Sequence, residues 1–191
     1  KNFNHIVSAI YEHGLEIGLI TNGAKLRTYG DNGEFAQHIP HRTSWHGVLP
    51  ETIDKLTWVR ISMAGLDHDE RKVYVPDIDL AKTTLGFSYV AHDVYEAPED
   101  KSHGKVSTKR DLMNLKPKYL TQIEDGLPRN VWMFEDRIEE LTAQIGGYAS
   151  MYKPKYVRLL PNCLEPELIP QRCEQLRKMA LTINRKYLAD R

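Results

Sequence analysis

The sequence predicts an α/β fold: a partial (β/α) barrel, in which a curved, parallel sheet carries helices on its outer face. Short apolar runs rich in β-branched residues alternate with helical patterns or long connections, which is typical of parallel strands joined by crossovers. Four such units make about half of an eight-stranded barrel of about 250 residues, and this chain has 191. The competing doubly wound sheet is disfavoured because no G-x-G-x-x-G or G-x-x-x-x-G-K-[ST] phosphate signature is present.

Helical spacing of apolar residues opens the chain, and His13-Gly14 is expected to end this first helix. The pattern is already under way at Lys1, so we expect a piece of a longer polypeptide. Glu16–Ile20 is predicted to be a buried strand that ends in the turn Thr21-Asn22-Gly23. The stretch from Tyr29 to Pro50 is rich in Gly, Asn, His and Pro, which indicates a loop with one short helix.

Two further strands are predicted at Thr57–Ser62 and Leu85–Ala91, both β-branched or aromatic. Between them, Ile78–Thr84 is interpreted as a short helix. A charged loop from Ala97 to Arg110 then leads to a helical stretch, Asp111–Asp125, that Pro117 interrupts.

The strongest helical pattern covers Val131–Gly146, which Gly146-Gly147 is expected to end. Its apolar stripe consists of Phe134, Ile138, Leu141 and Ile145, and its polar face of Glu135, Asp136, Arg137, Glu139 and Glu140. The fourth strand is predicted at Lys155–Leu160. A last helix follows, with Leu176, Met179, Ile183 and Tyr187 on one face. Without repeats or linkers, residues 1–191 are expected to form a single incomplete domain.

Composition points to a globular protein, with 41% hydrophobic and 27% charged residues. The formal net charge is zero, so nothing indicates nucleic acid as a partner. No apolar run approaches the roughly 18 residues of a membrane span, so no membrane partner is expected. The only two cysteines, Cys163 and Cys173, cannot build a disulfide framework, which favours a cytoplasmic setting. Both thiols are expected to be packed inside the fold.

In parallel α/β folds, ligands bind at the carboxyl ends of the strands. Here these ends carry hydroxyl, amide, guanidinium, imidazole and thiol groups, which suit a polar ligand but form no obvious catalytic triad. The residues are Thr21, Asn22, Arg60, Ser62, His92, Leu160, Pro161 and Cys163.

The same strand ends resemble, in order and rough spacing, those of the radical S-adenosylmethionine enzymes. Gly14 to Gly23 (GLEIGLITNG) is similar to the family's third strand, and Leu56 to Gly65 (LTWVRISMAG) to its fourth. Leu85 to Val90 (LGFSYV) resembles the fifth strand, and Tyr156 to Pro161 (YVRLLP) the sixth. The resemblance covers most of the chain and corresponds to the second half of that family's barrel.

The resemblance implies S-adenosylmethionine as the cofactor. Ser62 would bind its ribose or amino-acid end, and Thr21 and Asn22 would shape the adjacent wall. The backbone at Leu160 and Pro161 would border the adenine. Arg60 lies on the same strand face as Ser62, one step deeper. Tyr89 and His92 are candidates for substrate contact.

The family's C-x-x-x-C-x-x-C loop, which ligates a [4Fe-4S] cluster, does not occur in the chain. By resemblance it would lie upstream of Lys1. The complete enzyme would cleave S-adenosylmethionine reductively to start radical chemistry on an unknown substrate, whereas these residues alone are expected to be inactive. The missing N-terminal half, or a partner chain, would cover the inner face of the sheet.

Two other functions stay open from the sequence: a non-catalytic half-barrel that binds a partner, or a different α/β barrel enzyme. The histidines His38, His41 and His46 share a loop, but no nearby cysteine supports a zinc site, so no metal ligand is predicted. The basic run from Lys101 to Arg110 is interpreted as a solvated loop.

Overall fold

The computed structural model describes residues 2–23, 26, 48–67, 73–96, 118–120 and 129–189. They belong to two compact units. Unit 1 comprises Lys1–Gly65, Lys72–Tyr89 and Met151–Arg158, and unit 2 comprises Leu66–Arg71, Val90–Ser150 and Leu159–Arg191. The expectation of a single incomplete domain stays a prediction. The loop histidines 38, 41 and 46 and the basic run 101–110 lie outside the described residues.

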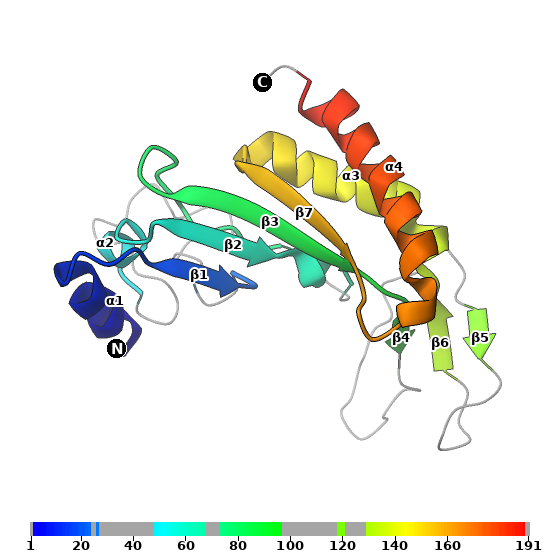
Figure 1. Ribbon diagram of the computed structural model, residues 1–191, viewed down its shortest axis with the longest axis horizontal. Coiled ribbons are helices and arrows are strands. Elements are labelled where there is room, and N and C mark those ends of the chain that lie inside the picture. The colour runs from blue at the N-terminus through cyan, green and yellow to red at the C-terminus, as the bar shows by residue number, and fades with distance from the viewer. Residues whose placement is uncertain are drawn as a thin grey trace, which may run out of the picture. The chain divides into compact units, whose positions relative to one another are not determined.

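A four-stranded sheet contains β1 (Gly18–Thr21), β2 (Trp58–Ser62), β3 (Thr84–Ala91) and β7 (Tyr156–Pro161), in the order β1-β2-β3-β7 (Figure 1). β1 is parallel to β2, and β2 to β3. The amide of Lys155 donates to the Leu85 carbonyl, and that of Asn162 to the Ala91 carbonyl. Residue numbers rise together along the two strands, so β7 is parallel to β3. The parallel α/β sheet predicted from the sequence is confirmed.

The two faces of this sheet differ in burial. Val59 and Ile61 of β2 are 0% exposed, as is Phe87 of β3, and all three point to one side, here called the covered face. Trp58, Arg60 and Ser62 alternate with them and are only half-buried on the other side, here called the open face. The strands therefore contribute one face to the core and leave the other accessible.

Helix α1 (Asn2–Glu12) ends where the sequence predicts. Gly14 has φ +71°, and the amides of Gly14 and Leu15 donate to the carbonyls of Tyr11 and Ile10, which is a Schellman motif. The short helix α2 (Pro50–Ile53) follows at the end of the predicted loop. A core cluster joins these elements to β1; it contains Leu26, Val48 and Ile53, with Phe3, Leu19 and Ile78 packed against them.

The connection from β2 to β3 contains the 3-10 helix η1 (Met63–Asp67), and residues 73–79 have no regular structure. The helix predicted at Ile78–Thr84 is wrong. Asp79 closes a single turn instead: its side chain accepts from the Ala81 amide and its carbonyl from the amides of Lys82 and Thr83. The Thr83 hydroxyl then donates to the Leu56 carbonyl at 2.8 Å, which fixes the chain at the start of β3.

Unit 2 contains a small antiparallel sheet in the order β4-β6-β5, made of β4 (Val94–Glu96), β5 (Lys118–Leu120) and β6 (Arg129–Trp132). One helix prediction and the start of another predicted helix are wrong here. The described part of Asp111–Asp125 is β5, and residues 131–132 belong to β6 rather than to a helix that begins at Val131. Pairing between strands overrides the local helical pattern in both segments.

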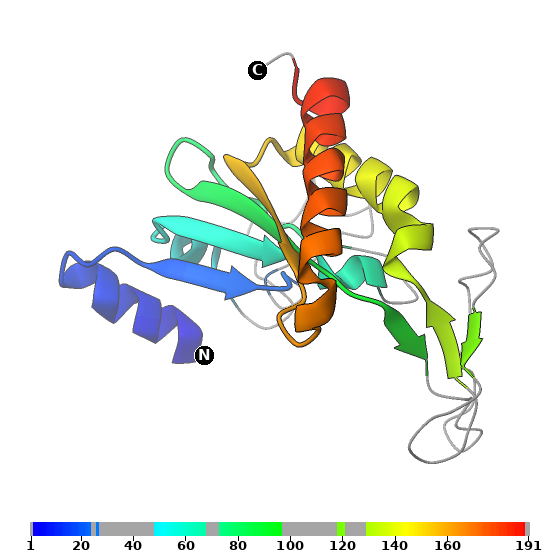
Figure 2. The same ribbon diagram turned by 45° about the vertical axis from the view of Figure 1, so that its right-hand side comes forward.

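Helix α3 runs from Phe134 to Tyr152, followed by the 3-10 turn η4 (Pro166–Leu168) and by helix α4 (Ile169–Tyr187) (Figure 2). The predicted stop at Gly146-Gly147 is wrong, because α3 continues through both glycines. Gly146 lies directly against the Tyr187 ring of α4, so this glycine serves helix packing. Within the described residues, no helix has the length and apolar character needed to cross a bilayer.

The two adjacent glycines of α3 give a matched test of that packing. A methyl group on Gly147 would meet no atom within 4 Å, so Gly147→Ala is expected to stabilise the protein by about 0.5–1 kcal/mol through helix propensity. A methyl group on Gly146 would collide with Tyr187, so Gly146→Ala is expected to destabilise despite the same propensity gain. Urea denaturation checks both variants, and equal shifts of the two midpoints would contradict this packing.

Candidate ligand-binding face of the sheet

Four predicted cofactor residues lie at the carboxyl ends of β1 and β2, all in unit 1. In the strand register Thr21 pairs with Ile61, so Thr21 and Ser62 end neighbouring strands at the same edge. Asn22 follows Thr21 directly, and Arg60 lies two residues before Ser62 on the open face. Alternation puts the Thr21 side chain on the covered face with Ile61, while Ser62 faces the open side.

Local hydrogen bonds account for part of this arrangement. The Gly23 amide donates to Thr21 Oγ1 at 3.1 Å, and Gly23 has φ +76°. A side chain on Gly23 would also meet the Tyr74 carbonyl, so only glycine suits this turn. The Ala64 amide approaches Ser62 Oγ at 3.5 Å at the start of η1. Thr21 and Ser62 thus have structural tasks in addition to any role in binding.

Arg60 is the central polar group of the open face. In register it stands between Ile20 of β1 and Gly86 of β3. Its Nε is buried and has no hydrogen-bond partner among the described residues. A buried guanidinium N–H without an acceptor is costly, so the hydrogen bonding of Arg60 is incomplete among the described residues.

Two aromatic rings cover glycines of the same sheet. The indole of Trp58 lies over Gly18, and the phenol ring of Tyr156 lies over Gly86. A Cβ atom at either glycine would collide with the ring, so a larger residue there would displace it. Trp58 is half-buried and Tyr156 is 39% exposed, so both rings keep surface that a ligand can contact.

The remaining candidates are placed differently. Tyr89 is 1% exposed on the covered face of unit 1, where it contributes to the core. In unit 2, the His92 Nδ1–H donates to the Val90 carbonyl at 2.9 Å, and its Nε2 lies 3.8 Å from Asp67 Oδ2. Leu160 and Pro161 are half-buried in the unit 2 part of β7. The structure therefore brings Thr21, Asn22, Arg60 and Ser62 to one edge of unit 1, with Thr21 on the covered face and Arg60 and Ser62 on the open face.

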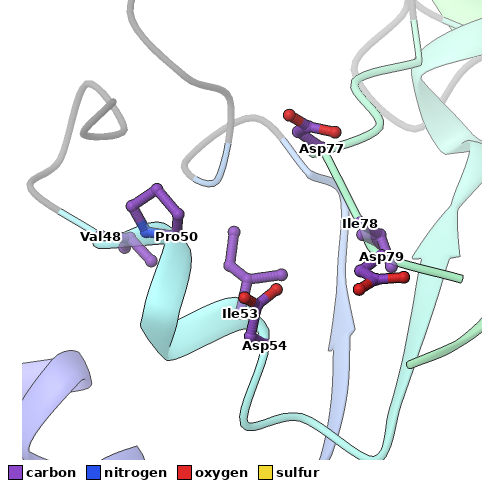
Figure 3. Close-up of a pocket in the computed structure, with 7 residues that line it drawn as sticks. All are labelled: Val48, Pro50, Ile53, Asp54, Asp77, Ile78 and Asp79. Atoms are coloured by element: carbon purple, nitrogen blue, oxygen red, sulfur yellow. The ribbon is translucent and has the colours of Figure 1, made fainter. Parts of the chain in front are cut away.

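Unit 1 also contains a cavity of about 240 Å³ between α2 and the segment before β3 (Figure 3). It is lined by Val48, Pro50, Ile53, Asp54, Asp77, Ile78 and Asp79. Val48, Ile53 and Ile78 of this lining also belong to the core cluster with Leu19 and Leu26, so the cavity lies beside β1.

Lys82 forms ion pairs with two of the carboxylates around this cavity. Its Nζ lies 3.2 Å from Asp79 Oδ2 and 3.7 Å from Asp54 Oδ2. The hydrogen bond from the Ala81 amide, together with that from Lys82, lowers the pKa of Asp79 below its usual value. These carboxylates stabilise the turn before β3, which leaves the open face as the stronger ligand site.

Two buried ion pairs in unit 2 were not predicted from the sequence. Arg172 of α4 is 1% exposed, and its Nη2 donates to Asp93 Oδ1 at 2.8 Å. The same oxygen accepts from the Phe134 amide at 2.7 Å, so Asp93 also caps the first turn of α3. The guanidinium of Arg172 lies 4.8 Å above the Phe134 ring. Asp93 therefore joins the end of β3 to both long helices.

The second pair joins Arg137 of α3 to Asp67. Arg137 is 3% exposed and donates from Nη2 to Asp67 Oδ1 at 2.6 Å. Its expected place on the polar face of α3 is wrong, because Asp67 provides a buried partner. One signal was present: Arg137 lies between Phe134 and Leu141 on the apolar stripe. Arg172 likewise precedes Leu176 by one helical turn on the stripe of α4.

Both cysteines depart from expectation. Cys163, in the turn after β7, and Cys173, on α4, are exposed rather than packed. On α4 the buried positions are taken by Arg172, Leu176, Met179 and Ile183, which leaves the Cys173 side chain outside. Among the residues that the structure describes, no three His, Cys, Asp or Glu side chains are grouped so that they could hold a metal ion.

No protein-family model, curated protein or solved structure matches this chain.

Proposed function

We propose that this chain is the second half of a radical S-adenosylmethionine enzyme's barrel and supplies part of its cofactor site. The observation that carries the proposal is the buried, unpartnered Nε of Arg60 on the open face, two residues before Ser62. The sequential order of four parallel strands supports it, because such an order is typical of a barrel wall. The polar ends of β1 and β2 then face the ligand.

The chemistry of these residues suits S-adenosylmethionine. Its carboxylate is an acceptor for the Arg60 guanidinium. Ser62 Oγ and the Asn22 side chain can exchange hydrogen bonds with its ribose hydroxyls or its ammonium group. The tasks of this chain are therefore to bind the cofactor and to fix its orientation at the carboxyl edge of the sheet.

A [4Fe-4S] cluster does not suit this chain by itself. The sequence holds two cysteines, fewer than the three thiolates of the family's loop, and both are exposed on different elements. In the proposal, the cluster ligands come from a segment outside these 191 residues. S-adenosylmethionine would supply radical chemistry only when such a cluster is present.

The rival function is a half-barrel that binds a partner chain without catalysis. The exposure of two large apolar side chains on the open face favours it: Ile20 is 55% exposed and Tyr156 is 39% exposed. A partner that covered the open face would bury both.

Titration of the chain with S-adenosylmethionine by calorimetry distinguishes the two. We expect Arg60→Met to weaken binding at least about tenfold, since a hydrogen bond to a charged group contributes about 1.5–3 kcal/mol. Ser62→Leu is expected to weaken it by filling the adjacent space. Arg177→Met is the matched control, because Arg177 is an exposed arginine of α4 that pairs with Glu174.

All variants should keep the wild-type circular dichroism spectrum and urea midpoint. Arg60→Met and Ser62→Leu variants that bind S-adenosylmethionine as tightly as the wild-type chain would overturn the proposal. In that case the rival function would be favoured by the exposed Ile20 and Tyr156.

A further inference from the structure

We infer that the groove between helices α3 and α4 of unit 2 binds an amphipathic anion, namely a carboxylate on an unbranched aliphatic chain of medium length. Lys186 would hold the carboxylate, and the chain would lie against Ala143 and Ile138. The groove contains none of the residues assigned to the cofactor, so this inference goes beyond the proposed function and does not depend on it.

The groove follows from the way the two helices pack. Gln171 and Gln175 of α4 donate to Glu135 Oε1 in the first turn of α3, at 3.2 and 3.4 Å. Farther along both helices, the Tyr187 ring lies against Gly146. The helices therefore advance in the same direction. Between these two contacts is a groove of about 410 Å³, lined by side chains of both helices. Sites for small molecules have volumes of about 300–1,000 Å³.

The walls of the groove offer apolar surface. Ile138 and Tyr187 are half-buried and Ala143 is exposed, so all three keep surface that a ligand can contact. The hydroxyls of Thr142 and Thr182 also line the groove, but each already donates to the carbonyl four residues earlier in its own helix. Few polar groups are left for a ligand along the walls, which suits an aliphatic chain.

The charges around the groove favour an anion. Two lysines and one glutamate line it. Helix α3 has no acidic residue after Glu140, and α4 has none after Glu174. The half of the groove beside Tyr187 therefore has basic side chains from α4 and no carboxylate from either helix. A surface of this composition attracts anions.

Lys186 is the better of the two lysines for holding a carboxylate. The Nζ of Lys178 lies 3.6 Å from Glu174 Oε1, so its charge is compensated within α4. Lys186 is exposed and forms no ion pair with another residue that the structure describes. Glu139 lies early on α3 and Lys186 late on α4, so they stand at opposite ends of the groove. Attraction at one end and repulsion at the other orient the anion.

The length of the groove sets the length of the ligand. On α4 its lining extends from Lys178 to Tyr187, which is about 13 Å along the axis at a rise of about 1.5 Å per residue. An extended eight-carbon carboxylate fits within this length, so octanoate is the probe.

Four compounds separate the charge from the chain: octanoate, the neutral 1-octanol, the cationic octylammonium, and acetate. Calorimetric titration of the full chain measures each affinity, and spectra of the ¹³C-labelled isoleucine methyl groups locate the site. We expect octanoate to bind and to shift the Ile138 resonance. The other three should bind at least threefold more weakly. The resonance of Ile20, an exposed isoleucine of unit 1, should not move.

Variants then assign the contacts. Ala143→Phe should abolish octanoate binding, because the larger side chain fills the groove. Ala180→Phe is the matched control, since Ala180 is an exposed alanine of α4 outside the groove, and it should leave the affinity unchanged. Lys186→Met should weaken octanoate at least threefold and remove its advantage over octanol. Arg177→Met, at an exposed arginine of α4, should have no effect.

Several results would overturn the inference. Among them are a wild-type chain that does not bind octanoate, and equal affinities for octanoate and octanol. A shift of Ile20 instead of Ile138 would place the ligand on unit 1, which contradicts the site. So would unchanged affinity in folded Ala143→Phe and Lys186→Met variants. None of these measurements contains S-adenosylmethionine, so their outcome leaves the proposed function to its own test.

Discussion

Replacing Asp93 with alanine is expected to lower the free energy of unfolding by about 3–5 kcal/mol, because the buried Arg172 charge would lose its partner at 2.8 Å and keep only Glu135, at 3.9 Å. The same change removes the acceptor of the Phe134 amide, so the first turn of α3 also loses its cap. Urea denaturation, followed by far-UV circular dichroism, measures the loss. Of the single changes considered for unit 2, this one should have the largest effect.

Two controls show whether burial causes the effect. Glu174→Ala breaks another arginine–carboxylate contact of α4, with Arg177, but both side chains are exposed and we expect little change. The double variant Asp93→Ala, Arg172→Met should be more stable than the sum of the single changes predicts, because it removes both buried charges. Additive losses would show that the two side chains do not depend on each other.

Phe87→Ala is expected to cost about 3–5 kcal/mol, since Phe87 is 0% exposed on the covered face. Its ring centroid lies 6.4 Å from that of Tyr152 in an edge-to-face arrangement, so the substitution also removes an aromatic contact. The resulting cavity would lie beneath the centre of the sheet. Thermal or urea unfolding of the protein measures the change.

Ile20→Ala is the matched control from the other face of the same sheet. Ile20 is 55% exposed, so this substitution is expected to change stability by about 0.5 kcal/mol or less. If Ile20→Ala destabilised the protein as much as Phe87→Ala, the open face would be packed against another part of the protein. That face would then be closed to a ligand and to a partner chain alike.

The parallel sheet could be predicted from the sequence because its signals are local. The runs at Glu16–Ile20, Thr57–Ser62 and Leu85–Ala91 are rich in apolar residues, most of them β-branched or aromatic, as strands are. Gly14 ends α1 because its left-handed backbone conformation suits glycine. These preferences belong to the residues themselves, so they hold before any tertiary contact forms.

The placement of Thr21 and Ser62 at one edge also followed from the sequence. Consecutive parallel strands carry their carboxyl ends to the same edge, so the ends of two such strands must be neighbours. Which face would stay open did not follow. Arg60 and Ile61 are adjacent in the sequence, and only packing against the covered face makes one half-buried and the other fully buried.

The sequence by itself determined the strand order and the two long helices, whereas the tertiary structure decided the small antiparallel sheet, the extent of α3 and the buried charges. Arg172 and Asp93 are 79 residues apart, and Arg137 and Asp67 are 70 apart, so no local pattern contains both partners. A charged side chain is excluded from a core unless its counter-ion arrives there too. A distant contact also explains why α3 continues through Gly146. Packing against Tyr187, 41 residues later, offsets the low helix propensity of glycine.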